Sequence, residues 1–288
     1  MTPDEYCQDK AAQSGSSFYY AFLFLPPEKR RAITALYAFC REVDDVVDET
    51  SEPSVARMKL AWWRSQIEDL FEHGKAEHPV MQALQPHVDP FDITAARLHE
   101  IIEGMEMDLD QHHYHSFDEL KVYCRRAAGV VGELSASIFG YSDPATLAYA
   151  DQLGLAFQLT NIIRDVGDDA RRGRIYLPME ELERFNAQPE DILQGSHTDA
   201  FEALMRFQTE RANQQYRDAL AILPEADRRA QRPGLLMAAI YHALLNEIAR
   251  DGWHVLNQRI ALTPIRKFWL AWKTWVTGGR GLVRRLSP

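Results

Sequence analysis

Apolar residues recur at helical spacing along nearly the whole chain, and this pattern constrains the fold more than any other feature. No run of alternating apolar and polar residues of the strand type interrupts it. Proline or a capping residue precedes several of the helical segments, at Pro26-Pro27, Asp143-Pro144, Leu177-Pro178, Thr198-Asp199 and Thr263-Pro264. Residues 74–90 and 186–196 lack the pattern and are expected to be loops. We therefore predict an all-α fold class, with residues 1–288 forming a single helical domain.

The chain is acidic and has enough apolar residues for a large core. Hydrophobic residues make up 46% of the 288 residues, and the formal net charge is −10. Nucleic acid is excluded as the main partner, because a phosphate backbone attracts basic surfaces. Cys7, Cys40 and Cys124 fit neither a zinc site nor a disulfide framework. The N-terminal residues do not resemble a signal peptide, and no apolar run is long enough to cross a bilayer, so we predict a cytoplasmic protein.

Three aspartates lie close together within residues 37–48, in a helix expected to cover residues 27–50. At ~100° per residue, Asp44 and Asp48 fall on the apolar face of this helix and Asp45 lies at its flank. Carboxylates that face a core repel one another and are costly to desolvate, and a divalent cation removes that cost. Oxygen ligands favour Mg²⁺, with Mn²⁺ as the alternative, over zinc. Taken alone, the motif is explained more simply as a solvated acidic helix end.

A second polar row consists of Asn161, Asp165 and Asp169, spaced four residues apart. This spacing places one amide and two carboxylates along one helix face over ~12 Å. Such a row can hold Mg²⁺ while a diphosphate completes the coordination, and the neighbouring Arg164 can donate to phosphate oxygens. For this row alone, an asparagine followed by surface acids is an equally good explanation. The two rows together predict a metal-dependent clamp for a diphosphate group.

At these residues the chain resembles the squalene/phytoene synthase family. The matching segments are residues 16–19, 37–48, 104–109, 123–132, 158–169 and 174–178. Residues 104–109 and 123–132 look most like the bacterial presqualene diphosphate synthases of hopanoid biosynthesis. The histidine run His112, His113 and His115 departs from the family pattern. Its spacing lacks the pairing of a zinc helix, so an exposed loop explains it better than a metal site.

The resemblance implies an isoprenoid synthase-type helical bundle around a central apolar cavity. It implies a transferase that joins two farnesyl diphosphates head to head into presqualene diphosphate, releases diphosphate and requires Mg²⁺. The alternatives are a phytoene synthase that uses geranylgeranyl diphosphate and a full squalene synthase that uses NADPH. NADPH is not expected, because no Gly-x-Gly-x-x-Gly follows a strand. Later enzymes of the squalene pathway are candidate protein partners.

The resemblance also assigns the site residues. The expected metal ligands are Asp44, Asp45, Asp48, Asn161, Asp165 and Asp169. The expected catalytic residues are Asp44, Asp48, Tyr37, Tyr123, Asp165 and Asp169. The expected substrate-binding residues are Ser17, Phe18, Arg41, Arg164, Arg174 and Tyr176. Further candidates are apolar walls at Phe18, Phe22, Leu153 and Phe157, and glycines near the substrate or a neighbouring helix at Gly129, Gly132 and Gly154.

The last segment, residues 264–288, reverses the charge of the rest of the chain, because it holds six basic residues and no acid. Trp269, Trp272 and Trp275 recur in it every three residues. Basic and aromatic residues in this pattern predict peripheral contact with the inner face of a membrane. The simpler alternative is a last helix that packs its tryptophans on the core. A non-catalytic, membrane-peripheral lipid-binding protein would share this tail but would not need the acidic rows.

Overall fold

The computed structural model describes residues 1–13, 21–50, 52–279 and 282. Within these residues every regular element is helical, so the predicted all-α fold class is confirmed. The helices are α1 Pro3–Gln13, α3 Pro27–Glu49, α4 Pro53–His73, α5 Pro79–Leu84, α6 Ala95–Asp110, α7 Phe117–Cys124, α8 Val130–Phe139, α9 Ala145–Arg171, α10 Met179–Phe185, α11 Pro189–Leu193, α12 Asp199–Ile222, α13 Arg232–Arg250 and α14 Pro264–Thr277. A 3₁₀ turn, Gln85–His87, follows α5, and a π-helical turn, Arg125–Gly129, joins α7 to α8.

The helices begin where prolines and capping residues predict. Proline is the first residue of α3 and of α14, where its missing N–H costs nothing. Thr198 Oγ1 accepts a hydrogen bond from the backbone N–H of Phe201 at 3.2 Å, and Thr263 Oγ1 accepts one from Arg266 at 3.3 Å. These bonds satisfy donors that the first helical turn leaves free, and they fix the starts of α12 and α14.

Two segments that were expected to be loops contain short helices, so that prediction is wrong in part. Residues 74–90 include α5, and residues 186–196 include α11. Six and five residues respectively are too few for a helical period to be visible in the sequence. Tertiary packing stabilises α5, because Val80, Met81 and Leu84 are buried where it packs on α1 and α3.

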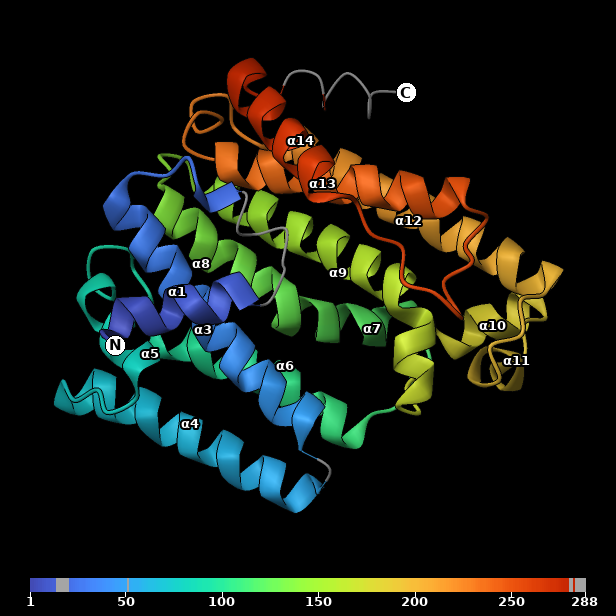
Figure 1. Cartoon of the computed structure of the whole chain (residues 1–288), viewed down its shortest axis with the longest axis horizontal. Helices are drawn as coiled ribbons and strands as arrows, with labels where there is room; N and C mark the ends of the chain where they lie inside the picture. The colour runs from blue at the N-terminus through green and yellow to red at the C-terminus, as the bar shows by residue number, and fades with distance from the viewer. Residues whose placement is uncertain (14–20, 51, 280–281, 283–288) are drawn as a thin grey trace.

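The long helices α3 and α9 form opposite sides of the molecule's centre (Figure 1). On one side, α3 packs against α1, α4, α5 and α6, and on the other, α9 packs against α12 and α13. The short α8 packs on both α3 and α9. One buried apolar core runs through these helices without interruption. The layout leaves room for a cavity between the two long helices.

Glycines allow α8 and α9 to approach closely. A Cβ on Gly132 of α8 would overlap the carbonyl oxygen of Ala150 of α9, and a Cβ on Gly154 of α9 would lie 2.6 Å from the carbonyl oxygen of Ala128 in the π-helical turn before α8. Because these contacts involve backbone atoms, a side chain could not be accommodated without separating the helices. Helix packing therefore explains the glycines, and Gly132 and Gly154 also line the cavity.

Candidate active site

A cavity of about 780 Å³ lies between α3, α6 and α8 on one side and α9 and α13 on the other. This volume is within the range of ~300–1,000 Å³ that is usual for ligand pockets. Its lining changes from apolar to polar along α9, from Tyr149 and Leu153 to Asp165 and Asp169. Twenty residues separate Tyr149 from Asp169, so the lining extends for ~30 Å of helix. The cavity therefore has an apolar deep end and a polar end.

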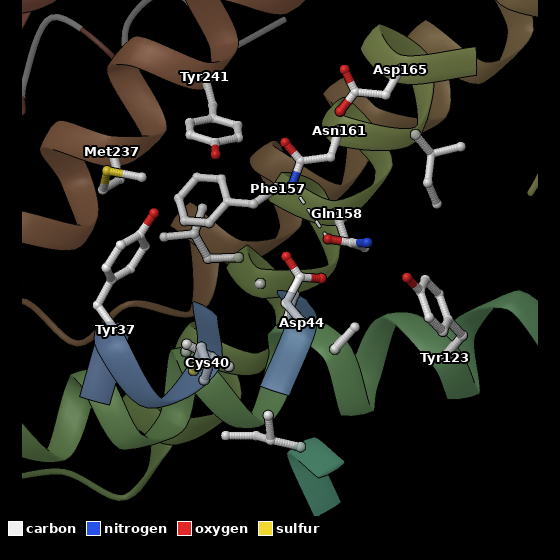
Figure 2. Close-up of a pocket in the computed structure, with 18 of the residues that line it drawn as sticks. Tyr37, Cys40, Asp44, Tyr123, Phe157, Gln158, Asn161, Asp165, Met237 and Tyr241 are labelled. Carbon is white, nitrogen blue, oxygen red and sulfur yellow. Dashed lines mark hydrogen bonds between the residues drawn. The ribbon is translucent and has the colours of Figure 1, made fainter. Parts of the chain in front are cut away.

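The α3 wall carries Tyr37, Cys40, Arg41, Asp44 and Asp48 into the cavity, at steps of three or four residues except for the neighbours Cys40 and Arg41. The spacing follows the helical period, so these side chains share one face. Figure 2 shows Tyr37, Cys40 and Asp44 on this face. The first and third aspartates of the motif, Asp44 and Asp48, therefore line the cavity, as predicted.

Asp45, the middle aspartate of the motif, does not line the cavity. It accepts a hydrogen bond from Arg41 at 2.5 Å and forms an ion pair with Lys10 of α1 at 2.8 Å. Its carboxylate therefore fixes Arg41 and ties α1 to α3. The lining includes Asp44 and Asp48 but not Asp45, which lies ~100° around the helix from Asp44, so this placement gives no support to the expectation that Asp45 binds metal directly.

The carboxyl group of Asp44 is held in an unfavourable environment for its charge. Burial and the nearby charge of Asp48 raise its pKa to about 7, although Arg41 opposes this at a hydrogen-bond distance of 2.7 Å. A raised pKa means that the charged form lacks sufficient compensation from the protein. An additional cation beside this carboxylate would supply it.

The α9 wall places Asn161, Asp165 and Asp169 along the cavity, as the four-residue spacing predicts. The side-chain oxygen Oδ1 of Asn161 is buried and, within the described residues, has no hydrogen-bond partner. Its amide nitrogen donates to Gln158 Oε1 at 3.3 Å (Figure 2). Buried oxygens without a partner are rare. An unpaired oxygen that faces a cavity is suited to coordinate a cation.

The pKa values of the two carboxylates of this row are shifted in opposite directions. Burial would raise the pKa of Asp165, but hydrogen bonds and charge from Arg164 and Arg259 outweigh it and hold the pKa below its usual value. Arg164 Nε lies 2.7 Å from Asp165 Oδ1, and Arg259 Nε lies 3.0 Å from it. By contrast, burial and the charge of Asp165 raise the pKa of Asp169 to about 8. Asp169 is therefore the carboxylate of this row whose negative charge is less well compensated, although Arg174 and Arg172 lower its pKa in part.

The side chains at the polar end fit a metal ion that is shared with a ligand. Across the described part of the chain, no group of three or more His, Cys, Asp or Glu side chains is close enough to hold a metal ion by itself. Mg²⁺ commonly binds one or two carboxylates and completes its shell with water and phosphate oxygens. Asp44 and Asp48 on one wall, with Asn161 and Asp169 on the other, are suited to such shared coordination.

Arginines surround the acids at the polar end. Arg174 Nη1 donates to Asp48 Oδ1 at 3.2 Å, and Arg172 Nη1 forms an ion pair with Asp48 Oδ2 at 2.8 Å. Arg41 and Arg164 line the same end, as the sequence predicts, but both are already paired with acids of their own helix. The sequence did not indicate Arg172 or Arg259. Arg172 follows the end of α9 and Arg259 lies between α13 and α14, so no helical period predicts where their side chains lie.

A buried carboxylate, Asp108 of α6, also belongs to the cavity lining and was not singled out from the sequence. Tyr176 donates to Asp108 Oδ1 at 2.7 Å and Tyr123 donates to Oδ2 at 3.1 Å, with the two rings stacked 5.1 Å apart. Burial raises the pKa of Asp108 to about 6 in spite of these donors. The sequence did contain a signal that this aspartate is buried, because Asp108 continues the apolar stripe of Ile101 and Met105 on α6.

The histidine run lies in an exposed loop, as the sequence interpretation prefers. Its backbone has a structural function. The carbonyl of His112 accepts from the N–H of Ile175 at 3.0 Å, and the carbonyl of His115 accepts from Glu180 at 3.1 Å. These bonds hold the segment between α9 and α10, which presents Arg174 and Tyr176 to the cavity.

The remaining predicted residues divide into two groups. Phe22, Leu153 and Phe157 line the apolar part of the cavity, as expected. Ser17 and Phe18 lie outside the described residues. The predicted residues that line the cavity are consistent with a site for an apolar chain that ends in a strongly anionic group.

An all-helical bundle that encloses such a cavity, with acids from two opposed helices at one end, defines the class of isoprenoid synthases. The squalene/phytoene synthase family model matches residues 11–266. The chain belongs to the squalene/phytoene synthase family.

Curated relatives and solved structures are similar over most of this chain. The 15-cis-phytoene synthase of Synechocystis is 36% identical over 283 residues, which cover 93% of this chain and 84% of that protein. The phytoene synthase of Mycobacterium bovis is 38% identical, covering 87% and 83% of the two chains. A crystal structure of a dehydrosqualene synthase with a ligand matches with a TM-score of 0.84 and 28% identity over 96% of both chains. The squalene synthase HpnC from Alicyclobacillus acidocaldarius matches with a TM-score of 0.77 and 29% identity, covering 87% and 94%.

Proposed function

We propose that the protein is a Mg²⁺-dependent synthase that condenses two prenyl diphosphates head to head. The observation that carries this proposal is the pair of polar rows, on α3 and α9, at one end of a cavity whose other end is apolar. A prenyl diphosphate has the same division into an anionic head and a long apolar chain.

At the polar end, the proposed ligands of the metal are Asp44, Asp48, Asn161 and Asp169. When bound, Mg²⁺ supplies Lewis-acid stabilisation of the charge on the departing diphosphate. Asp165 is already neutralised by two arginines, so we propose that it fixes Arg164 and Arg259 for contact with phosphate oxygens. Such charge-assisted contacts are stronger than neutral hydrogen bonds.

In the proposed reaction, the C1–O bond of the first substrate breaks and its electron pair leaves with diphosphate. The C2–C3 double bond of the second substrate then attacks C1 of the resulting allylic cation, and loss of a proton closes a cyclopropane. In a phytoene-type reaction, loss of the second diphosphate and another proton yields a hydrocarbon without any reductant. The atoms therefore balance without NADPH.

The apolar walls protect the cation from water. Tyr37, Phe157 and Tyr241 surround one region of the cavity (Figure 2). Aromatic faces attract a cation without reacting with it. Water in this region would convert the cation to an alcohol, so exclusion of water is part of the chemistry.

Tyr123 and Tyr176 are suited to act near the cationic carbon. Both line the cavity, and both phenolic hydroxyls donate to Asp108. Electron-rich oxygens at this position would stabilise positive charge, and a phenol that takes up the proton lost from the cation would pass its own proton to Asp108.

The length of the prenyl chain separates two candidate functions. The resemblance of residues 104–109 and 123–132 to presqualene diphosphate synthases favours farnesyl diphosphate as the substrate. The curated relatives named above are phytoene synthases, and they support the alternative with geranylgeranyl diphosphate better. The two structural neighbours carry the names dehydrosqualene synthase and squalene synthase, which keeps the farnesyl reaction as the second candidate.

One experiment tests both the class of reaction and the length of the prenyl chain in the substrate. The protein is incubated with farnesyl or geranylgeranyl diphosphate and Mg²⁺, without NADPH, and the products are analysed by mass. A hydrocarbon from geranylgeranyl diphosphate supports the phytoene reaction, and a product that retains one diphosphate after reaction with farnesyl diphosphate supports the presqualene reaction. If neither substrate releases diphosphate in a metal-dependent way, the proposal is wrong and a lipid-binding protein becomes the better explanation.

A further inference from the structure

The last helix, α14, exposes a continuous apolar face to solvent. The exposed fractions are 83% for Ile265, 50% for Phe268, 48% for Trp269, 51% for Trp272 and 62% for Val276. Apart from the neighbours Phe268 and Trp269, they are spaced three or four residues apart, which places them on one side of the helix. The opposite side, with Leu270, Ala271 and Thr274, is buried where α14 packs on α13.

This arrangement decides between the two sequence interpretations of the tryptophans. Only Trp275 packs inward, where its ring stacks on Phe24 with centroids 5.2 Å apart. Trp269 and Trp272 are directed outward, so packing on the core does not account for them. A contiguous exposed apolar patch of this kind indicates an interaction surface.

Basic side chains accompany the apolar face, and no acid lies on the helix. Lys273 Nζ lies 4.7 Å from the centre of the Trp269 ring. The chain as a whole has a formal net charge of −10, so the positive charge of this helix is a local feature. Arg266 is partly neutralised by Glu247 at 2.7 Å, which attaches the helix to α13.

The helix runs beside the cavity. Burial and the charges of Arg164 and Arg259, two residues of the polar end, lower the pKa of Lys267 in the first turn of α14. Near the other end of α14, Trp275 contacts Phe24, two residues from the cavity wall at Phe22. Figure 1 shows α14 lying across the outer side of α13.

We propose that the exposed face of α14 docks on the surface of an anionic lipid bilayer and lies in the plane of the interface. No helix in the described ranges is long and apolar enough to cross a bilayer, so surface contact is the mode that α14 can use. Tryptophan and phenylalanine insert at the level of the headgroups, and basic residues attract anionic lipids. An apolar product formed beside this helix would then reach the bilayer without crossing bulk water.

A second copy of the chain fits this face less well. In a two-fold dimer the same patch meets itself, so the lysines of one copy would lie near those of the other. Since the helix carries no acid, nothing on it would compensate this repulsion. A surface of opposite charge is the better complement.

The test is flotation of the full chain with vesicles of phosphatidylcholine, alone or mixed with phosphatidylglycerol. We expect binding that increases with phosphatidylglycerol and decreases with salt. The triple variant Phe268→Ser, Trp269→Ser, Trp272→Ser should lose at least ~10-fold in vesicle partitioning, because three large apolar side chains no longer enter the interface. Lys273→Glu should reduce the preference for the anionic vesicles.

The matched control replaces three exposed apolar residues elsewhere, in the variant Met58→Ser, Val122→Ser, Leu193→Ser, which should partition like the natural sequence. Thermal unfolding by circular dichroism checks that all variants are folded. Equal vesicle binding by the natural chain and the α14 variant would overturn the proposal. The proposal would also be overturned if the natural chain did not bind vesicles and formed a dimer through this face. Release of diphosphate is measured separately, so failure of membrane docking is distinguishable from failure of the proposed function.

Discussion

Arg174 donates a hydrogen bond to Asp48 at 3.2 Å, which links residues 126 positions apart in the chain. Asp48 belongs to α3, and Arg174 follows α9, so this contact joins the two walls at the polar end of the cavity. The acids of the proposed metal site are thus held near arginines that can also contact the phosphate groups of a substrate.

Removal of a carboxylate from either row should abolish turnover while the protein remains folded. We expect Asp44→Ala and Asp165→Ala each to lower kcat by at least ~10²-fold, as for the loss of one main electrostatic contact in other enzymes. The measurement is release of diphosphate at saturating Mg²⁺, with circular dichroism as the check on folding. Glu225→Ala, which removes an exposed acid that does not line the cavity, is the control. Near-normal rates in either aspartate variant would contradict the assigned functions.

The planar guanidinium group of Arg174 should contribute to activity through its geometry as well as its charge. Arg174→Lys keeps the charge but loses the paired donors that fit a phosphate or carboxylate. We expect kcat/KM for the prenyl diphosphate to fall ~10-fold in the lysine variant and further in Arg174→Gln. Steady-state kinetics would measure this, and Arg206→Gln, at an exposed arginine of α12, serves as the control. Equal activity of the lysine variant and the natural chain would show that charge alone is sufficient.

The metal-free protein should lose stability as the pH rises from about 4 to about 8. The pKa of Asp44 is raised from 3.8 to about 7, and that of Asp169 from 3.8 to about 8. In this range the folded state holds protons that the unfolded state has released, so the free energy of unfolding decreases with increasing pH.

Urea unfolding at a series of pH values, with a chelator present, measures this slope. The double variant Asp44→Asn, Asp169→Asn should have a flatter profile, because neither side chain titrates. Mg²⁺ should raise the unfolding temperature of the natural chain more at about pH 8 than at about pH 6, since the metal competes with the bound protons. A slope that is unchanged in the double variant would assign the titration to other groups.

The deep end of the cavity should control the length of the prenyl chain. The hydroxyl of Tyr149 lies 3.0 Å from the position that a Cβ on Gly234 would take, and it is buried with no hydrogen-bond partner among the described residues. Tyr149→Ala would enlarge this end, and Gly234→Ala would narrow it.

We expect Tyr149→Ala to shift the ratio of kcat/KM for geranylgeranyl over farnesyl diphosphate upward by ~10-fold, and Gly234→Ala to shift it downward. Competition between the two substrates, followed by mass analysis of the products, measures the ratio. Tyr141→Ala, at an exposed tyrosine outside the cavity, is the control. If both cavity variants moved the ratio in the same direction, the deep end would not be the determinant of length.

The fold class and the two polar rows could be predicted from the sequence, because both depend on the local helical period. Asp44 and Asp48 share a face with Tyr37 and Cys40 whatever the rest of the chain does. Asn161, Asp165 and Asp169 align for the same reason. The starts of α12 and α14 could also be predicted from the sequence, because the hydroxyl of a capping threonine accepts a hydrogen bond from the backbone of the first helical turn.

The rest was decided by contacts between residues that are distant in the chain. Asp45 is turned away from the cavity and paired with Lys10, and Arg259 reaches Asp165 from the segment between α13 and α14. Asp108 becomes an acceptor for two tyrosines only when α6, α7 and the segment after α9 meet. Helical periodicity fixes the direction of a side chain on its own helix. Which arginine neutralises which acid, and how deep the apolar end extends, depend on how separate helices pack, and a local pattern carries no information about that packing.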